Sequence, residues 1–114
     1  MAQLLVNKRD GKQVPFEASR IAAAVAKAYD AAGVPKEENH FDEVVEGVVE
    51  SVRANYTDTN PGVEEIQDLV ERHLMAQGLY DVSKRYILYR EERRQRREAL
   101  RQERIRLAGA GKLT

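Results

Sequence analysis

The chain has 114 residues, of which 42% are hydrophobic and 33% are charged, and this suits one small domain with a charged surface. It contains no cysteine, which excludes disulfides and thiolate metal sites and fits a reducing, cytoplasmic setting. No apolar run approaches the ~20 residues that a membrane span needs, and the N-terminal residues lack the pattern of a signal peptide.

The formal net charge is zero, but the two signs are separated along the chain. Residues 1–83 contain 8 Lys and Arg against 15 Asp and Glu, a net charge of −7. Residues 84–106 contain 10 Lys and Arg against 4 Asp and Glu, a net charge of +6. The sequence therefore predicts an acidic body followed by a basic C-terminal segment.

The first predicted element is a β-hairpin over Gln3–Phe16. Asp10-Gly11 is a strong signal for a two-residue turn, because glycine adopts positive φ at little cost. Pro15 cannot donate a hydrogen bond to a central ladder, so the return strand is expected at an edge or to end there. A two-stranded hairpin is not stable alone, so we expect it to lie over other elements.

Four helices follow, and each shows apolar residues at helical spacing. The first begins after Phe16 and ends at Gly33, the second covers about 41–54, the third about 63–77, and the fourth begins near Asp81. After Arg90 the apolar spacing almost stops, so the last part of the fourth helix is expected to project or to act as a linker. The predicted fold is α+β and mainly α: a four-helix bundle capped by a small β-sheet of two or three strands, with a charged helical extension.

Three cations flank the junction between the hairpin and the first helix: Lys8, Arg9 and Arg20. Lys8 and Arg9 are consecutive, so on a strand one faces a pocket beneath the hairpin and the other reaches around its edge. Arg20 lies in the first turn of the helix, where backbone N–H groups and the helix dipole also favour anions. The residues alone leave two interpretations open, a site for a phosphate chain and three solvated surface charges.

No catalytic or metal-binding motif stands out. The two histidines are far apart, and the sequence has neither a nucleophile motif nor a Walker-type glycine-rich loop. His73 lies on the apolar side of the third helix and is interpreted as a packing residue. The Arg-rich tail has interleaved glutamates and no aromatic residue after Tyr89, so a solvated helix or connector is favoured over a nucleic-acid interface. We therefore expect a non-catalytic chain without a metal site of its own.

The segment VNKRDGKQVPFEASRI resembles the signature of the ATP-cone family, in which Lys-Arg-Asp-Gly precedes a short strand ending in Phe and a basic residue at the start of a helix. The later segment VEEIQDLVERHLMAQGLYDVSKRYILYR resembles the second half of the same domain. Together they cover about residues 3–92. The resemblance divides the chain into an ATP-cone over residues 1–92 and a charged helical extension over residues 93–114 that leads toward a missing catalytic domain.

The resemblance implies a nucleotide-binding regulatory domain, as found at the N-terminus of ribonucleotide reductase large subunits, where ATP sustains activity and dATP inhibits many members by changing subunit assembly. Its implied ligands are ATP or dATP with Mg²⁺. Its implied partners are the catalytic domain of the same reductase and the radical-generating subunit, with a nucleotide-dependent oligomer. The implied nucleotide-binding residues are Val6, Lys8, Arg9, Val14, Phe16, Glu17, Arg20, Ile21, Val63 and Gln67.

Within that set, the resemblance places Lys8, Arg9 and Arg20 at the phosphates and Gln67 near them. The sequence also departs from the family pattern. Some members have an acid at the position of Val14 and a threonine around Val63, and valine can supply only apolar contact there. The family sheet has a third strand, which we assign to residues 55–60.

Two alternatives of other kinds stay open. One is a helical interaction module that uses its basic C-terminal helix to bind an acidic protein surface or nucleic acid. The other is an ATP-cone whose nucleotide site has degenerated, so that only a scaffold role remains.

Overall fold

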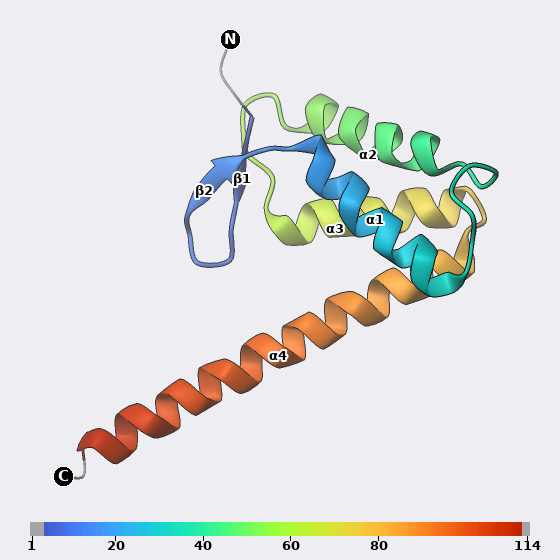
Figure 1. The fold of residues 1–114 in the computed structure, drawn as a ribbon. Coiled ribbons are helices and arrows are strands. Elements are labelled where there is room, and N and C mark those ends of the chain that lie inside the picture. The colour runs from blue at the N-terminus through green and yellow to red at the C-terminus, as the bar shows by residue number, and fades with distance from the viewer. Residues whose placement is uncertain (1–3, 113–114) are drawn as a thin grey trace.

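The computed structural model describes residues 4–112, a small hairpin against a bundle from which one long helix projects (Figure 1). The elements in chain order are β1 (Leu5–Asn7), β2 (Gln13–Pro15), α1 (Ala18–Ala32), α2 (Phe41–Asn55), α3 (Val63–Ala76) and α4 (Tyr80–Lys112). The predicted fold class, mainly α with a small β-sheet, is confirmed. Gln3, the predicted first residue of the hairpin, lies outside the described residues.

The hairpin forms where the sequence predicts it, but its turn is longer than predicted. Val6 pairs with Val14 in an antiparallel register, and the N–H of Lys8 donates to the carbonyl of Lys12 at 2.8 Å. The N–H of Gly11 donates to the carbonyl of Lys8 at 3.0 Å, so Arg9 and Asp10 are the central turn residues and Gly11 follows with φ 87°. The prediction of a two-residue turn at Asp10-Gly11 is therefore wrong. The loop has three residues, Arg9, Asp10 and Gly11, because a turn followed by a glycine in the left-handed conformation also connects two antiparallel strands.

The prediction of a third strand at residues 55–60 is also wrong, because the sheet within the described residues has two strands. The segment beside β1 comes immediately afterwards. The N–H of Asn7 donates to the carbonyl of Pro61 at 2.9 Å, and Asn7 and Gly62 form an isolated parallel bridge. Pro61 has no N–H to extend a ladder, and α3 begins at Val63, so the pairing stops after one bridge.

The core lies between the four helices and is dominated by valine. Its buried hydrophobic residues are Ile21, Val25, Ala28, Tyr29, Val44, Val48, Val52, Val70, Leu74, Val82 and Tyr86. Tyr29 is fully buried, packs edge-on against Phe41 with ring centroids 5.4 Å apart, and donates its hydroxyl to the carbonyl of Asn39 at 2.7 Å. Since β-branched residues have modest helix propensity, packing against the other helices stabilises α2.

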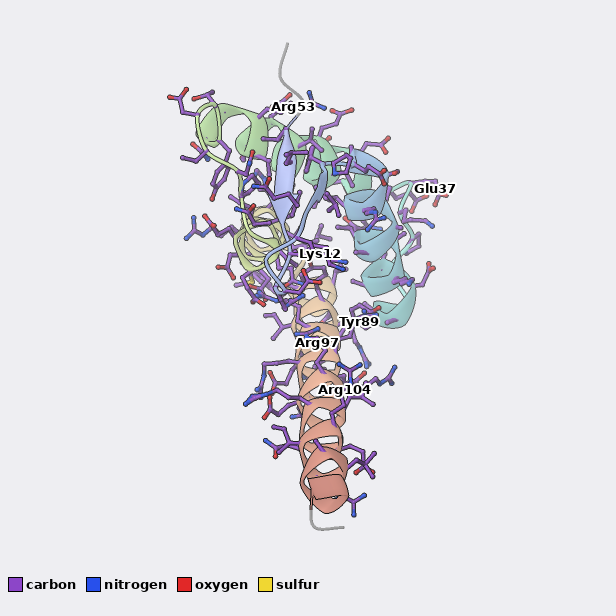
Figure 2. The ribbon with its side chains drawn as sticks, turned by 90° about the vertical axis from the view of Figure 1, so that its left-hand side faces the viewer. Lys12, Glu37, Arg53, Tyr89, Arg97 and Arg104 are labelled. Carbon is purple, nitrogen blue, oxygen red and sulfur yellow. The ribbon has the colours of Figure 1, made fainter. Side chains whose placement is uncertain are left out.

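α4 is a continuous helix of 33 residues, about 50 Å long at 1.5 Å per residue. Its first part packs against α1 and α3, and the rest extends away from the bundle (Figure 1). Figure 2 shows Arg97 close to the point where α4 leaves the bundle and Arg104 farther out, with side chains on all sides of the helix. Ion pairs spaced three residues apart, such as Arg106–Glu103 at 2.6 Å, stabilise this exposed part. The predicted projecting helix is observed.

Candidate functional site

A cavity of about 210 Å³ lies beneath the hairpin, and we call it the hairpin cavity. It is bounded by β1, β2, the start of α1, the first half of α3 and one residue of α4. Its lining residues are Val6, Lys8, Val14, Pro15, Phe16, Glu17, Arg20, Ile21, Ala24, Val63, Ile66, Gln67, Val70 and Tyr86. Nine of the ten residues that the resemblance implies are therefore among its lining, and the exception is Arg9.

The hairpin provides one wall of the cavity, mainly through residues on one face of its sheet. Val6 and Val14 are cross-strand partners, so their side chains lie on the same side of the sheet and both reach the cavity. Lys8 is two residues from Val6 and also reaches the cavity, at its exposed edge. Phe16 follows the last strand residue, and its ring lies 5.9 Å from the guanidinium carbon of Arg53 on α2. This contact holds the aromatic ring of the wall in place.

The start of α1 provides another wall. Glu17 is the N-cap residue in an extended conformation, and its side chain makes no capping hydrogen bond. α1 also has no acidic residue in its first turn, whereas α2, α3 and α4 each have at least one. The positive end of this helix dipole and its free N–H groups therefore lack an acidic partner within that first turn. Arg20 and Ala24 are one turn apart and both line the cavity.

The cavity combines an apolar interior with charged groups at its edge. Ile21 and Tyr86 are buried among its inner residues, with 7% and 4% of their surfaces exposed. Lys8 and Arg20 are exposed at the edge, and the Nε of Arg20 donates to a carboxylate oxygen of Glu17 at 3.0 Å. An apolar interior suits a planar base or a sugar, and edge cations suit phosphate groups. The residues present therefore fit a nucleotide.

Arg9 lies outside the hairpin cavity, in the turn of the hairpin. Its Nε donates to Oε1 of Glu64 at 2.9 Å, and its Nη2 donates to Oε1 of Gln67 at 3.3 Å. It lines a second cavity of about 310 Å³ between the turn, α3 and α4, which we call the turn groove. Gln67 lines both cavities, so Arg9 is separated from the hairpin cavity by one side chain.

Glu64 joins two arginines that come from different elements. Its Oε1 accepts from Arg9, and its Oε2 accepts from Nη2 of Arg90 on α4 at 3.0 Å. Arg90 also pairs with Asp68 at 3.1 Å and with Glu71 at 2.8 Å, and only 19% of its side chain is exposed. Partial burial opposes ionisation of Glu64, but the hydrogen bonds and charges of Arg9 and Arg90 outweigh it, so the pKa of Glu64 lies below its usual value.

Five lining residues lie outside the predicted set: Pro15, Ala24, Ile66, Val70 and Tyr86. Spacing alone could have found Ala24, since it lies four residues after Arg20 on the same side of α1. The others are apolar or aromatic residues in positions that the sequence assigns to the core or to the end of a strand. Burial raises the pKa of Tyr86 to about 12, so its hydroxyl is neutral at the base of the cavity.

His73, interpreted from the sequence as a packing residue, packs at the interface of α2 and α3. Its Nε2 lies 3.0 Å from the hydroxyl of Ser51, and its ring lies directly over Gly47. Within residues 4–112, no group of three or more His, Cys, Asp or Glu side chains is arranged to hold a metal ion. None of the helices in that range is long and apolar enough to cross a membrane.

Comparison with known protein families assigns the chain to one of them. The family model described as "ATP cone domain" matches residues 4–95, which include the hairpin, all lining residues of the cavity and the start of α4. The chain belongs to the ATP-cone family. The predicted resemblance is thereby confirmed, and the match ends within α4, close to the predicted boundary at residue 92.

Several curated relatives of this ATP-cone are ribonucleotide reductases. The chain is 38% identical over 96 residues to a ribonucleoside-diphosphate reductase subunit alpha of Chlamydia pneumoniae, covering 79% of this chain and 9% of the relative. It is 44% identical over 99 residues to a vitamin B12-dependent ribonucleoside-diphosphate reductase of Thermoplasma acidophilum, covering 82% of this chain and 12% of the relative. It is 37% identical over 101 residues to an anaerobic ribonucleoside-triphosphate reductase of Salmonella typhimurium, covering 86% of this chain and 14% of the relative. The ATP-cone thus spans only about a tenth of the length of these relatives.

Proposed function

We propose that the hairpin cavity binds ATP or dATP and that this ATP-cone regulates the overall activity of a ribonucleotide reductase. The observation that carries the proposal is the composition of one cavity. Residues from the hairpin, the start of α1 and the start of α3 meet there, and nine of them are residues that the family resemblance implies. The similarity to three differently named reductases supports the enzyme class.

In this proposal the base and sugar occupy the apolar interior, and the phosphates lie at the edge beside Lys8 and Arg20. The cavity of about 210 Å³ is smaller than the ~300–1,000 Å³ that encloses a drug-sized ligand, so the triphosphate extends out of it. Arg9 then lies within reach of the outer phosphates, on the other side of Gln67. Mg²⁺ is bound mainly by the phosphates, as is common for this ion in nucleotide sites.

Discrimination between ATP and dATP depends on the 2′-hydroxyl or on a different pose, because the two ligands share a base and a triphosphate. Polar groups that can bond a hydroxyl at the cavity include the carboxylate of Glu17, the amide of Gln67 and the hydroxyl of Tyr86. A ligand can shift the assembly equilibrium of the reductase only by its differential affinity for the competing states. Regulation through subunit assembly therefore requires that the two nucleotides be held differently.

Isothermal titration calorimetry of the chain with ATP, dATP and GTP in the presence of Mg²⁺ tests the proposal. We expect binding of the adenine nucleotides at micromolar concentrations and weaker binding of GTP. Lys8→Ala and Arg20→Ala should each weaken binding several-fold, because each removes a charge-assisted contact to phosphate. Lys27→Ala is the matched control, since Lys27 lies on α1 but not at the cavity. A folded sample that binds no adenine nucleotide would refute the proposal.

The ion pairs of α4 support the role of a connector for the charged extension. Arg94 pairs with Glu91 and Arg106 pairs with Glu103, so part of the basic charge is balanced within the helix itself. Binding of the chain to duplex DNA or RNA that falls steeply with salt would instead favour the helical interaction module.

A further inference from the structure

We propose that Glu64 sets the affinity of the nucleotide site by competing with the phosphates of the ligand for Arg9. This inference rests on the proposed function, because it assigns Arg9 to the outer phosphates of a nucleotide. Neither the family match nor the curated relatives assign any role to Glu64. The residue would act as an intrinsic anion that occupies Arg9 when no ligand is bound.

The geometry supports competition for the same donor groups. Arg9 uses its Nε and Nη2 to reach Oε1 of Glu64, at 2.9 and 2.8 Å, and Nη2 also donates to Gln67. These N–H groups form the planar fork with which arginine binds phosphate. A phosphate that binds to the Nε and Nη2 side of Arg9 therefore replaces the carboxylate of Glu64. Gln67 lines the hairpin cavity as well, so the competing position is next to the ligand.

The pair is exposed enough to exchange. The side chain of Arg9 is 37% exposed and that of Glu64 is 60% exposed. Exposed ion pairs contribute little, because water and salt screen them. A carboxylate in this setting can hold Arg9 in place without preventing a more highly charged triphosphate from displacing it.

The carboxylate of Glu64 is also well suited to release Arg9, because it has a second partner. Its other oxygen accepts from Arg90, which is held in turn by Asp68 and Glu71. Glu64 further lies in the first turn of α3, where the helix dipole favours a negative charge. After Arg9 moves to a phosphate, Glu64 therefore remains compensated by Arg90.

Calorimetry with ATP and with inorganic tripolyphosphate, on the wild-type chain and four variants, tests the inference. Glu64→Gln removes the charge but keeps the shape, and we expect it to bind ATP roughly two- to fivefold more tightly, the factor that corresponds to an exposed ion pair. Glu71→Gln is the matched control, since Glu71 lies on the same helix and pairs with Arg90 but has no pair with Arg9. In the Arg9→Ala background, Glu64→Gln should have no further effect on affinity.

The outcomes separate the inference from the proposed function. If the wild type binds ATP and Glu64→Gln binds it equally or more weakly, the inference is overturned and the proposed function stands. If Glu71→Gln tightens binding as much as Glu64→Gln does, or if the effect persists without Arg9, general repulsion explains it and the inference is again overturned. If ATP does not bind but tripolyphosphate binds, more tightly to Glu64→Gln, the competition is supported and the proposed function is refuted. Binding of neither ligand overturns both.

Discussion

Filling the hairpin cavity tests whether the nucleotide enters it, independently of the phosphate contacts. Ala24 lines the cavity from α1, and Ala24→Leu adds three carbon atoms at that position. The cavity of about 210 Å³ has the volume of several water molecules, each of which occupies about 30 Å³ of liquid, so it has room for the three added carbon atoms. The larger side chain would then occupy volume that the base or sugar needs.

The expected effects on binding and on stability differ. Three buried carbons add up to about 2.4 kcal/mol of favourable burial, while overpacking costs about 1–3 kcal/mol. The free energy of unfolding should therefore change by no more than about 1–2 kcal/mol. The affinity for ATP should fall more than tenfold, a loss of at least about 1.4 kcal/mol, because the ligand and the leucine cannot share the space.

Calorimetry with ATP and urea denaturation measure the two quantities on the same samples. Ala23→Leu is the matched control, because Ala23 is the preceding residue of α1, is exposed and does not line the cavity. It should bind ATP like the wild type. A folded Ala24→Leu protein with wild-type affinity for ATP would show that the nucleotide does not enter the hairpin cavity.

Three further predictions concern the packing that supports the site. Gly47→Ala should lower the free energy of unfolding by about 1–3 kcal/mol in urea denaturation, because the new Cβ would lie 2.7 Å from Nδ1 of His73. In the His73→Ala background the same change should stabilise the protein by up to about 1 kcal/mol, and a loss there would contradict the steric explanation. Burial raises the pKa of Tyr86 from 10.0 to about 12, so its contribution to stability is present below pH 10 and is lost as the pH rises toward 12. Between pH 8 and pH 11 the wild type should lose about 1.4 kcal/mol more than Tyr86→Phe, and equal losses would refute the shift. Ser83→Ala should raise the melting temperature, because the buried hydroxyl of Ser83 has no hydrogen-bond partner among the described residues, and a lower value would reveal a partner.

The part of the site that is continuous in sequence could be predicted well. The hairpin and the start of α1 lie within 16 residues, Val6 to Ile21, so adjacency alone brings their side chains to one region. The residues from α3 came from the family resemblance, since periodicity does not show which helix lies beneath the hairpin. Val70 and Tyr86 could not be separated from the core, because a buried apolar residue at helical spacing looks the same whether it faces another side chain or a cavity.

The partner of Arg9 could not be predicted for a related reason. The acidic body offers 15 carboxylates, and Glu64 is 55 residues away from Arg9. The choice among them depends on tertiary structure, namely on how the start of α3 lies along β1. The turn had the same difficulty, since Asp10-Gly11 fits both a two-residue and a three-residue loop and only the strand register decides between them.

The contact that replaced the predicted third strand explains how one short segment serves both cavities. The bridge between Asn7 and Gly62 places the first turn of α3 directly beside the hairpin. Consecutive residues on a helix point about 100° apart. Val63 therefore lines the hairpin cavity, while Glu64 reaches Arg9 in the turn groove.

α4 repeats this arrangement. Tyr86 lines the hairpin cavity and Arg90, one turn later, binds Glu64. The same two helices thus contribute to the inner wall of the hairpin cavity and to the ion pairs outside it. A change in the position of either helix would alter both regions together, and α4 is also the helix that leaves the bundle (Figure 1). If the hairpin cavity binds nucleotides as proposed, two ligands held in different poses would favour different positions of α4.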